Sequence, residues 1–132
     1  MKVLVCGTNA AVAEIAEAAV YDAGALPIGP VGNALAALGL ADQERPHLAI
    51  VDLSSVDGGT DLWLAEKLAE RGIELVCLTE DALPARLALR YPDIVAETAS
   101  RHALAERIAI LRQERRGSRA SRPPIDDLRT AV

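Results

Sequence analysis

Apolar residues occur along this chain as short continuous runs, separated by longer stretches in which they recur every three or four positions. The most marked run is residues 48–51, LAIV, which shows no polar alternation and ends at Asp52, before small polar residues and two glycines. Such runs are typical of strands that are buried on both faces of a parallel sheet. Ligands of these sheets bind beyond the carboxyl ends of the strands, so Asp52 is the first candidate for chemistry.

Four other apolar runs predict further strands, and helical periodicity predicts five helices after or between them. The run at 25–28 contains Pro27, which favours an edge strand because proline cannot donate a hydrogen bond to a neighbour. Five strands that alternate with five helices indicate right-handed βαβ units and an open parallel sheet. The expected strands are residues 2–6, 25–28, 48–51, 73–78 and 94–96, and the expected helix starts are Thr8 or Asn9, Asn33, Thr60 or Asp61, Pro84, and Ser100.

The amino-acid composition excludes an aromatic core, a membrane span and a disulfide framework. Half of the 132 residues are apolar but only three are aromatic, so the core must consist of aliphatic side chains, which favours helices packed on a sheet. No apolar run approaches the 18 residues of a membrane span, and the first residues lack a signal-peptide pattern, so we expect a cytoplasmic protein with no membrane partner. Cys6 and Cys77 both lie in strand-like runs and are expected to be buried free thiols, without a disulfide or a metal.

Charge is distributed unevenly along the chain. Residues 1–111 contain 8 basic and 16 acidic residues, whereas residues 112–132 contain 6 basic and 3 acidic ones. The globular part should therefore not bind nucleic acid. We expect a domain over residues 1–116 and a disordered tail rich in Arg, Ser and Pro over residues 117–132. If that tail is ordered, the residues expected to dock are Pro123, Pro124, Ile125 and Leu128.

The order of these elements resembles the receiver domain of bacterial two-component response regulators, over about residues 2–112. The segment PHLAIVDLSSVDGG looks like that family's phosphoacceptor strand and loop, and VCLTE looks like its fourth strand. The segments GALPIGPVGNALAAL and LAEKLAERGIELVCLT are similar to small stand-alone receivers. The resemblance implies a flavodoxin-like, doubly wound sheet of five parallel strands in the order 2-1-3-4-5, with five helices.

The resemblance also implies a site. In the family an Asp accepts a phosphoryl group from a histidine kinase or a small phosphodonor, with Mg²⁺ held by that Asp, an acidic pair and a backbone carbonyl. A hydroxyl residue and a Lys contact the phosphoryl group, and an aromatic residue acts as a switch. Placed on this chain, the acceptor is Asp52, the acidic pair falls at Gly7 and Thr8, the carbonyl at Ser54, the hydroxyl at Thr79, the Lys at Glu97 and the switch at Ile94.

Three of these replacements remove the charges that phosphoryl transfer needs. Mg²⁺ prefers carboxylate and phosphate oxygens, and Gly7 offers no side chain while Thr8 offers a neutral hydroxyl. An acyl phosphate would add about −1.5 to −2 charge beside Glu97, where the family has a cation. We therefore expect weak or absent Mg²⁺ binding and no enzymatic activity. The chain is interpreted as an atypical receiver that regulates a protein partner, such as a histidine kinase, a phosphotransfer protein or a transcription regulator.

Other interpretations stay open from the sequence. Asp52 can be the phosphoacceptor of a stand-alone receiver in a phosphorelay, or a structural acceptor of loop hydrogen bonds. Asp52 and Glu97 can also form a two-carboxylate cation site. A flavodoxin-like small-ligand binder is a further alternative, although the chain lacks a Gly-rich phosphate loop and a catalytic His, Cys or acid pair.

Two surface features suggest protein contacts. Trp63 aligns with Glu66, Lys67 and Glu70 on the polar side of its helix, so it is either a partner contact or a residue that lies over its own helix start. Receivers commonly pair through their fourth helix, fifth strand and fifth helix, which suggests a possible homodimer. That face would carry Arg86, Arg90, Arg101, Glu106 and Arg107.

Overall fold

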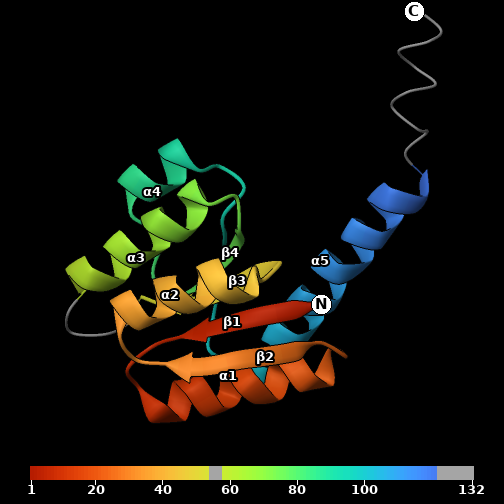
Figure 1. The fold of residues 1–132 in the computed structure, drawn as a ribbon, viewed down its shortest axis with the longest axis horizontal. Coiled ribbons are helices and arrows are strands. Elements are labelled where there is room, and N and C mark those ends of the chain that lie inside the picture. The colour runs from red at the N-terminus through yellow and green to blue at the C-terminus, as the bar shows by residue number, and fades with distance from the viewer. Residues whose placement is uncertain (54–57, 122–132) are drawn as a thin grey trace, which may run out of the picture.

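A computed structural model of the chain describes residues 1–53 and 58–121, without the side chains of residues 58–60 and 116–121. Within these residues five strands alternate with five helices (Figure 1). The strands form one sheet in the order β2-β1-β3-β4-β5, and every neighbouring pair is parallel, which confirms the flavodoxin-like fold. The elements are β1 Lys2–Cys6, α1 Ala10–Asp22, β2 Leu26–Val31, α2 Ala34–Glu44, β3 Leu48–Asp52, α3 Gly58–Glu70, β4 Glu74–Leu78, α4 Ala85–Arg90, β5 Val95–Glu97 and α5 Arg101–Ser121.

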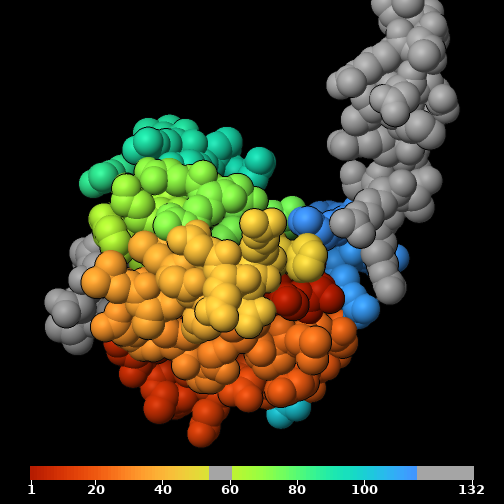
Figure 2. All heavy atoms as spheres, in the orientation of Figure 1, coloured from red at the N-terminus to blue at the C-terminus, as the bar shows by residue number. Residues whose placement is uncertain are grey.

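The sheet separates two apolar clusters because successive side chains of a strand point to opposite faces. Val51 and Cys77 belong to the cluster under α2, α3 and α4, whereas Ile50 and Leu78 belong to the cluster under α1 and α5. Figure 2 shows α2, α3 and α4 side by side over the first of these faces. All five residues of β3 are buried, as the unbroken apolar run predicts for a central strand.

Strand β2 lies at the edge of the sheet, as Pro27 predicts, but it continues to Val31 instead of ending at residue 28. Its pairing with β1 shifts register between Leu4 and Cys6. Gly29 makes this shift possible: its φ is +95°, and a Cβ atom there would stand 2.9 Å from the backbone N of Val31. A side chain at this position would be strained by conformation and by contact.

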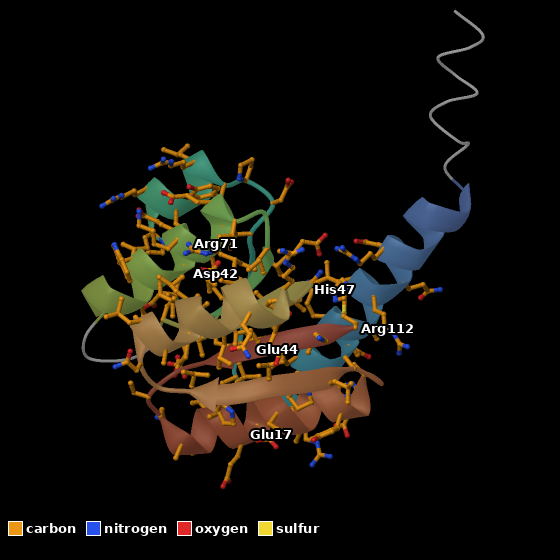
Figure 3. The ribbon with its side chains drawn as sticks, in the orientation of Figure 1. Glu17, Asp42, Glu44, His47, Arg71 and Arg112 are labelled. Atoms are coloured by element: carbon orange, nitrogen blue, oxygen red, sulfur yellow. The ribbon has the colours of Figure 1, made fainter. Side chains whose placement is uncertain are left out.

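Three of the expected helix starts are confirmed by hydrogen bonds from side chains to the backbone. Asn9 Oδ1 accepts from the amides of Ala11 and Val12, at 3.0 and 3.2 Å. Asn33 Oδ1 and Ser100 Oγ cap α2 and α5 in the same way. Helix α3 instead begins at Gly58, two residues before Thr60. Arg71, the residue after α3, binds Asp42 of α2, with Nε 2.7 Å from Oδ1 (Figure 3).

Helix α5 runs to Ser121, past residue 116, where we expected the domain to end. The residues after Leu111 include several Arg with Gln, Glu and Ala, which are good helix formers, so a change of composition there does not stop the helix. Figure 1 shows α5 extending well beyond the sheet. The rest of the expected tail, residues 122–132, lies outside the described residues. In the part of the chain that is described, none of the helices is both long and apolar enough to cross a bilayer.

Cys6 and Cys77 are buried free thiols, as expected. Burial raises the pKa of each to about 12. Both thiols are therefore protonated near neutral pH, and the thiolate that reacts with electrophiles is scarce.

Candidate functional site

The carboxyl ends of β3, β4 and β5 stand level with one another, which brings three of the expected site residues to one edge. Asp52 pairs in register with Leu78, and Leu78 pairs with Glu97. The amide of Leu53 donates to the Leu78 carbonyl at 2.9 Å, and the amide of Thr79 donates to the Glu97 carbonyl at 3.0 Å. Asp52, Thr79 and Glu97 therefore lie together at the end of the sheet where ligands of doubly wound folds bind.

Asp52 ends the central strand and only 2 % of its surface is exposed. Strand alternation directs its side chain to the same face as Ile50, which packs under α1 and α5. The strand thus holds this carboxylate at a fixed position on the rim of the core.

Gly7, where the resemblance would place an acidic residue, lies directly against Asp52. A Cβ atom built on Gly7 would stand 3.1 Å from the Cβ of Asp52 and 3.7 Å from Oδ2. The Gly7 amide donates to the Val31 carbonyl at 3.0 Å, which ties this loop to β2. Thr8 follows it and is exposed. The loop therefore brings backbone, and no carboxylate, to the side of Asp52.

Glu97 is held within the chain at two points. Its Oε2 atom lies 3.5 Å from Nε of Arg107 on α5, and its Oε1 atom accepts the amide of Thr98 at 3.2 Å. The Glu97 side chain is 18 % exposed. The Arg107 guanidinium therefore offsets the negative charge of Glu97 at this edge. From the sequence, Arg107 was expected only on the dimer face. A strand residue and a helix residue ten positions apart show no sequence pattern that would predict an ion pair between them.

The hydroxyl of Thr79 takes part in a local turn. Its Oγ1 atom accepts the amide of Asp81 at 3.2 Å. The hydroxyl hydrogen can still be donated, because a hydroxyl both donates and accepts. Thr79 therefore keeps the chemistry that its position implies.

Two other expected site residues are not part of this cluster. Ser54 lies outside the described residues. Ile94 precedes β5 and packs against the core cluster under α2, α3 and α4, at the amino end of the strand. Ile94 is thus separated from Asp52 by about the length of a strand. Among residues 1–53 and 58–121, no group of three His, Cys, Asp or Glu side chains is arranged to hold a metal ion.

Trp63 on α3 is 40 % exposed, as a partner contact requires. Its expected neighbour Glu66 is not on the polar side, however, and is only 6 % exposed. Arg86 of α4 forms an ion pair with Glu66: Nη2 donates to Oε2 at 3.0 Å, and Nε lies 2.9 Å from Oε1 without a hydrogen bond between them. Helix α4 covers this flank of α3, which is why the carboxylate is buried.

The expected dimer face also differs from the prediction. Arg101 points toward α1 and binds Asp22, with Nε 2.6 Å from Oδ2. Arg86 forms an ion pair with Glu66. The charges that we expected to pair between two copies are thus largely paired within one. Two apolar side chains are exposed instead, Leu89 of α4 at 84 % and Ile110 of α5 at 46 %.

Neither a protein-family model nor a curated protein sequence matches this chain. Solved structures do match it. SdrG from Pseudomonas melonis Fr1, in a BeF3-activated conformation, is 22 % identical with a TM-score of 0.64, over 83 % of this chain and 94 % of SdrG. A CheY-like receiver domain from Methanospirillum hungatei JF-1 is 17 % identical with a TM-score of 0.70, over 89 % of this chain and 97 % of that one.

The pseudo-receiver domain of the CikA protein is 18 % identical with a TM-score of 0.57, over 72 % of this chain and 80 % of that domain. At these identities the likeness is one of fold. The chain has the fold of response regulator receiver domains, as the resemblance of its sequence predicts.

Proposed function

We propose that this chain is an atypical receiver domain of two-component signalling, which regulates a protein partner largely without Mg²⁺-dependent phosphorylation. The observation that carries the proposal is Glu97, which stands where the resemblance implies a Lys and is bound by Arg107. A phosphoryl group on Asp52 would bring about two negative charges to this edge. Arg107 of α5, which lies at this edge, is already paired with Glu97, so the added charge would have to compete for it.

The loop after β1 supports the same proposal. Mg²⁺ requires several oxygen ligands in near-octahedral order. Gly7 places only backbone beside Asp52, and any side chain at this position would have to displace Asp52 by a few tenths of an ångström. Without a metal and a cation, the charge of the transferring phosphoryl group is not neutralised, and this neutralisation is most of what catalyses the reaction.

Such a domain can still regulate a partner protein by binding it through its surface, whatever the phosphorylation state of Asp52. Trp63 is the proposed anchor of the partner, since exposed Trp side chains are frequent hot spots of binding. The partner class is a histidine kinase, a phosphotransfer protein or a transcription regulator. Leu89 and Ile110 are the proposed contacts of a possible homodimer. The likeness to the CikA pseudo-receiver supports this class of function.

The second candidate is a phosphate-accepting receiver in a phosphorelay. It is favoured by the level positions of Asp52 and Thr79, which keep an acceptor and a hydroxyl at the same edge. Both candidates share the fold and the partners, and they differ in the chemistry of Asp52.

Labelling by a small phosphodonor distinguishes the two candidates. The protein is incubated with acetyl phosphate and Mg²⁺, and its intact mass is measured over time beside that of Asp52→Asn. We expect no phosphoryl adduct on either protein. Prompt Mg²⁺-dependent labelling of the wild type that Asp52→Asn abolishes would overturn the proposal and establish the phosphorelay candidate.

A further inference from the structure

A hollow of about 350 Å³ opens at the amino ends of β4 and β5. Its walls come from the end of α3, the start of β4 and the connection between α4 and β5. A volume of this size is enough for a small ligand or a few side chains. The strands are parallel, so this edge lies roughly 15 Å, one strand length, from the edge that carries Asp52. The hollow is therefore a separate feature from the candidate site.

The lining of the hollow combines an apolar wall with a charged rim. Ile73, Leu75, Tyr91 and Ile94 are among the residues of the apolar wall. Arg90 stands on the rim with Glu74 and Asp93, so both signs of charge are present. A matching occupant needs apolar side chains that are flanked by charges of both signs.

Helix α5 reaches this rim. Nη1 of Arg115 lies 3.8 Å from Oε1 of Glu74, and Glu74 lines the hollow. Figure 1 shows that α5 continues beyond the sheet from this region. Helix α5 continues to Ser121, so the segment that follows it starts about 9 Å along the helix axis from this contact.

The sequence after α5 has the composition that the hollow requires. Residues 122–129 read RPPIDDLR, with two apolar side chains, Ile125 and Leu128, three positions apart. Asp126 and Asp127 lie between them, and an Arg stands at each end of the segment. Eight residues can span up to about 27 Å when extended, which is enough to fold back from the end of a helix.

We propose that residues 122–129 of the same chain bind in this hollow, with Ile125 and Leu128 against Tyr91 and Ile94. The two Asp side chains then face Arg90, and the two Arg side chains face Glu74 and Asp93. Attachment through α5 favours this occupant over a separate molecule, because a short linker gives an effective concentration on the order of millimolar. The proposal is independent of the chemistry of Asp52 and goes beyond the proposed function.

A spin label on the full chain tests the proposal. Cys6 and Cys77 are buried with pKa values raised to about 12, so Ala131→Cys introduces a single reactive thiol for the label. We expect the label to broaden the amide NMR signals of Ile73, Tyr91 and Ile94, and to leave Asp52 and Thr79 at the other edge sharp. Signals at the hollow that stay sharp would overturn the proposal.

Matched variants test which residues bind. In the labelled chain, Ile125→Asp with Leu128→Asp should abolish the broadening, whereas Thr130→Asp with Val132→Asp adds the same charge and should preserve it. Arg90→Glu on the exposed rim should weaken it. The same loss in both double variants would overturn the assigned contacts. Broadening in a mixture of ¹⁵N chains without label and labelled chains without ¹⁵N would mean that a second copy is the occupant, and would also overturn the proposal.

Discussion

Gly7 lies so close to Asp52 that a Cβ atom on Gly7 would stand 3.1 Å from the Cβ of Asp52. This contact joins the ends of β1 and β3 at the centre of the carboxyl edge. It means that the residue at position 7 sets how much room the Asp52 side chain has. The chain therefore has glycine where the resemblance implies a metal ligand. The effect of a side chain at this position on the stability of the fold can be measured.

Gly7→Ala should destabilise the fold by about 1 kcal/mol, because one added methyl group must displace a buried neighbour. Gly39→Ala is the matched control, since no atom lies within 4 Å of a Cβ atom at that exposed position of α2. That change should stabilise the fold by roughly 0.5–1 kcal/mol, because glycine is a poor helix former. Urea unfolding of both variants measures the difference, and equal effects would contradict the assigned contact.

Restoring the missing charges should create phosphorylation. In Gly7→Asp, Thr8→Asp and Glu97→Lys combined, two carboxylates join Asp52 and a cation replaces an anion, so we expect Mg²⁺-dependent labelling by acetyl phosphate. Adding Asp52→Asn must remove it. Intact mass measures both results. A folded triple variant that binds Mg²⁺ and remains unlabelled would show that something other than these charges silences Asp52.

Glu97 and Arg107 should be coupled energetically. Their side chains are 18 % and 39 % exposed and the N–O distance is 3.5 Å, so we expect a coupling energy of about 0.5–1 kcal/mol. A double-mutant cycle of Glu97→Gln and Arg107→Gln, followed by urea unfolding, measures it. A coupling energy of zero would mean that Glu97 is not neutralised by α5, and would remove the main support for the proposed function.

Removal of Arg86 should cost more than removal of its neighbour. Arg86→Ala leaves the buried Glu66 carboxylate without its ion-pair partner, and we expect a loss of about 1–3 kcal/mol. The loss stays in this range because Arg86 itself is largely exposed. Arg90→Ala on the same helix removes only a guanidinium 5.5 Å from the centre of the Tyr91 ring, so its cost should stay below about 1 kcal/mol. Thermal unfolding compares the two. Equal costs would contradict the role of Arg86 in holding α4 on α3.

Arg101 should make part of the stability depend on acid. A hydrogen bond from Arg101 lowers the pKa of Asp22 from its ordinary value of 3.8. The pair therefore stabilises the fold above that value, and its contribution is lost as the pH falls through the lowered pKa.

In a ¹³C titration of the carboxyl groups, Asp22 should have a midpoint below 3.8, and Arg101→Gln should raise it. The midpoint of Asp42, which Arg71 lowers in the same way, should not change and serves as the control. An Asp22 midpoint that does not respond to Arg101→Gln would refute the assignment.

The strands and most helix starts could be predicted because their causes are local. Unbroken apolar runs marked β3 and β4, and Asn9, Asn33 and Ser100 stand where a helix needs an acceptor. The positions of Asp52, Thr79 and Glu97 at one edge followed from the expected strand ends together with the resemblance to receiver domains.

The partners of the charged side chains could not be predicted in the same way. Glu66 reads as a surface residue in the sequence, and only the packing of α4 on α3 buries it beside Arg86. Glu97 and Arg107 form an ion pair because β5 and α5 pack together. A sequence pattern of neighbouring residues does not predict such a contact. The extent of α5 was missed for a different reason, because a polar, Arg-rich sequence can be helical without being buried.

The edge strand β2 has a consequence for how partners can bind. Pro27 and Pro30 have no amide hydrogen, and the register shift at Gly29 disturbs the remaining ladder, so this edge is a poor template for a strand from another chain. At the opposite edge β5 offers only three residues. Both edges thus resist β-augmentation and the aggregation that starts from it. The partner that we propose would therefore bind mainly to side chains of the helices and loops.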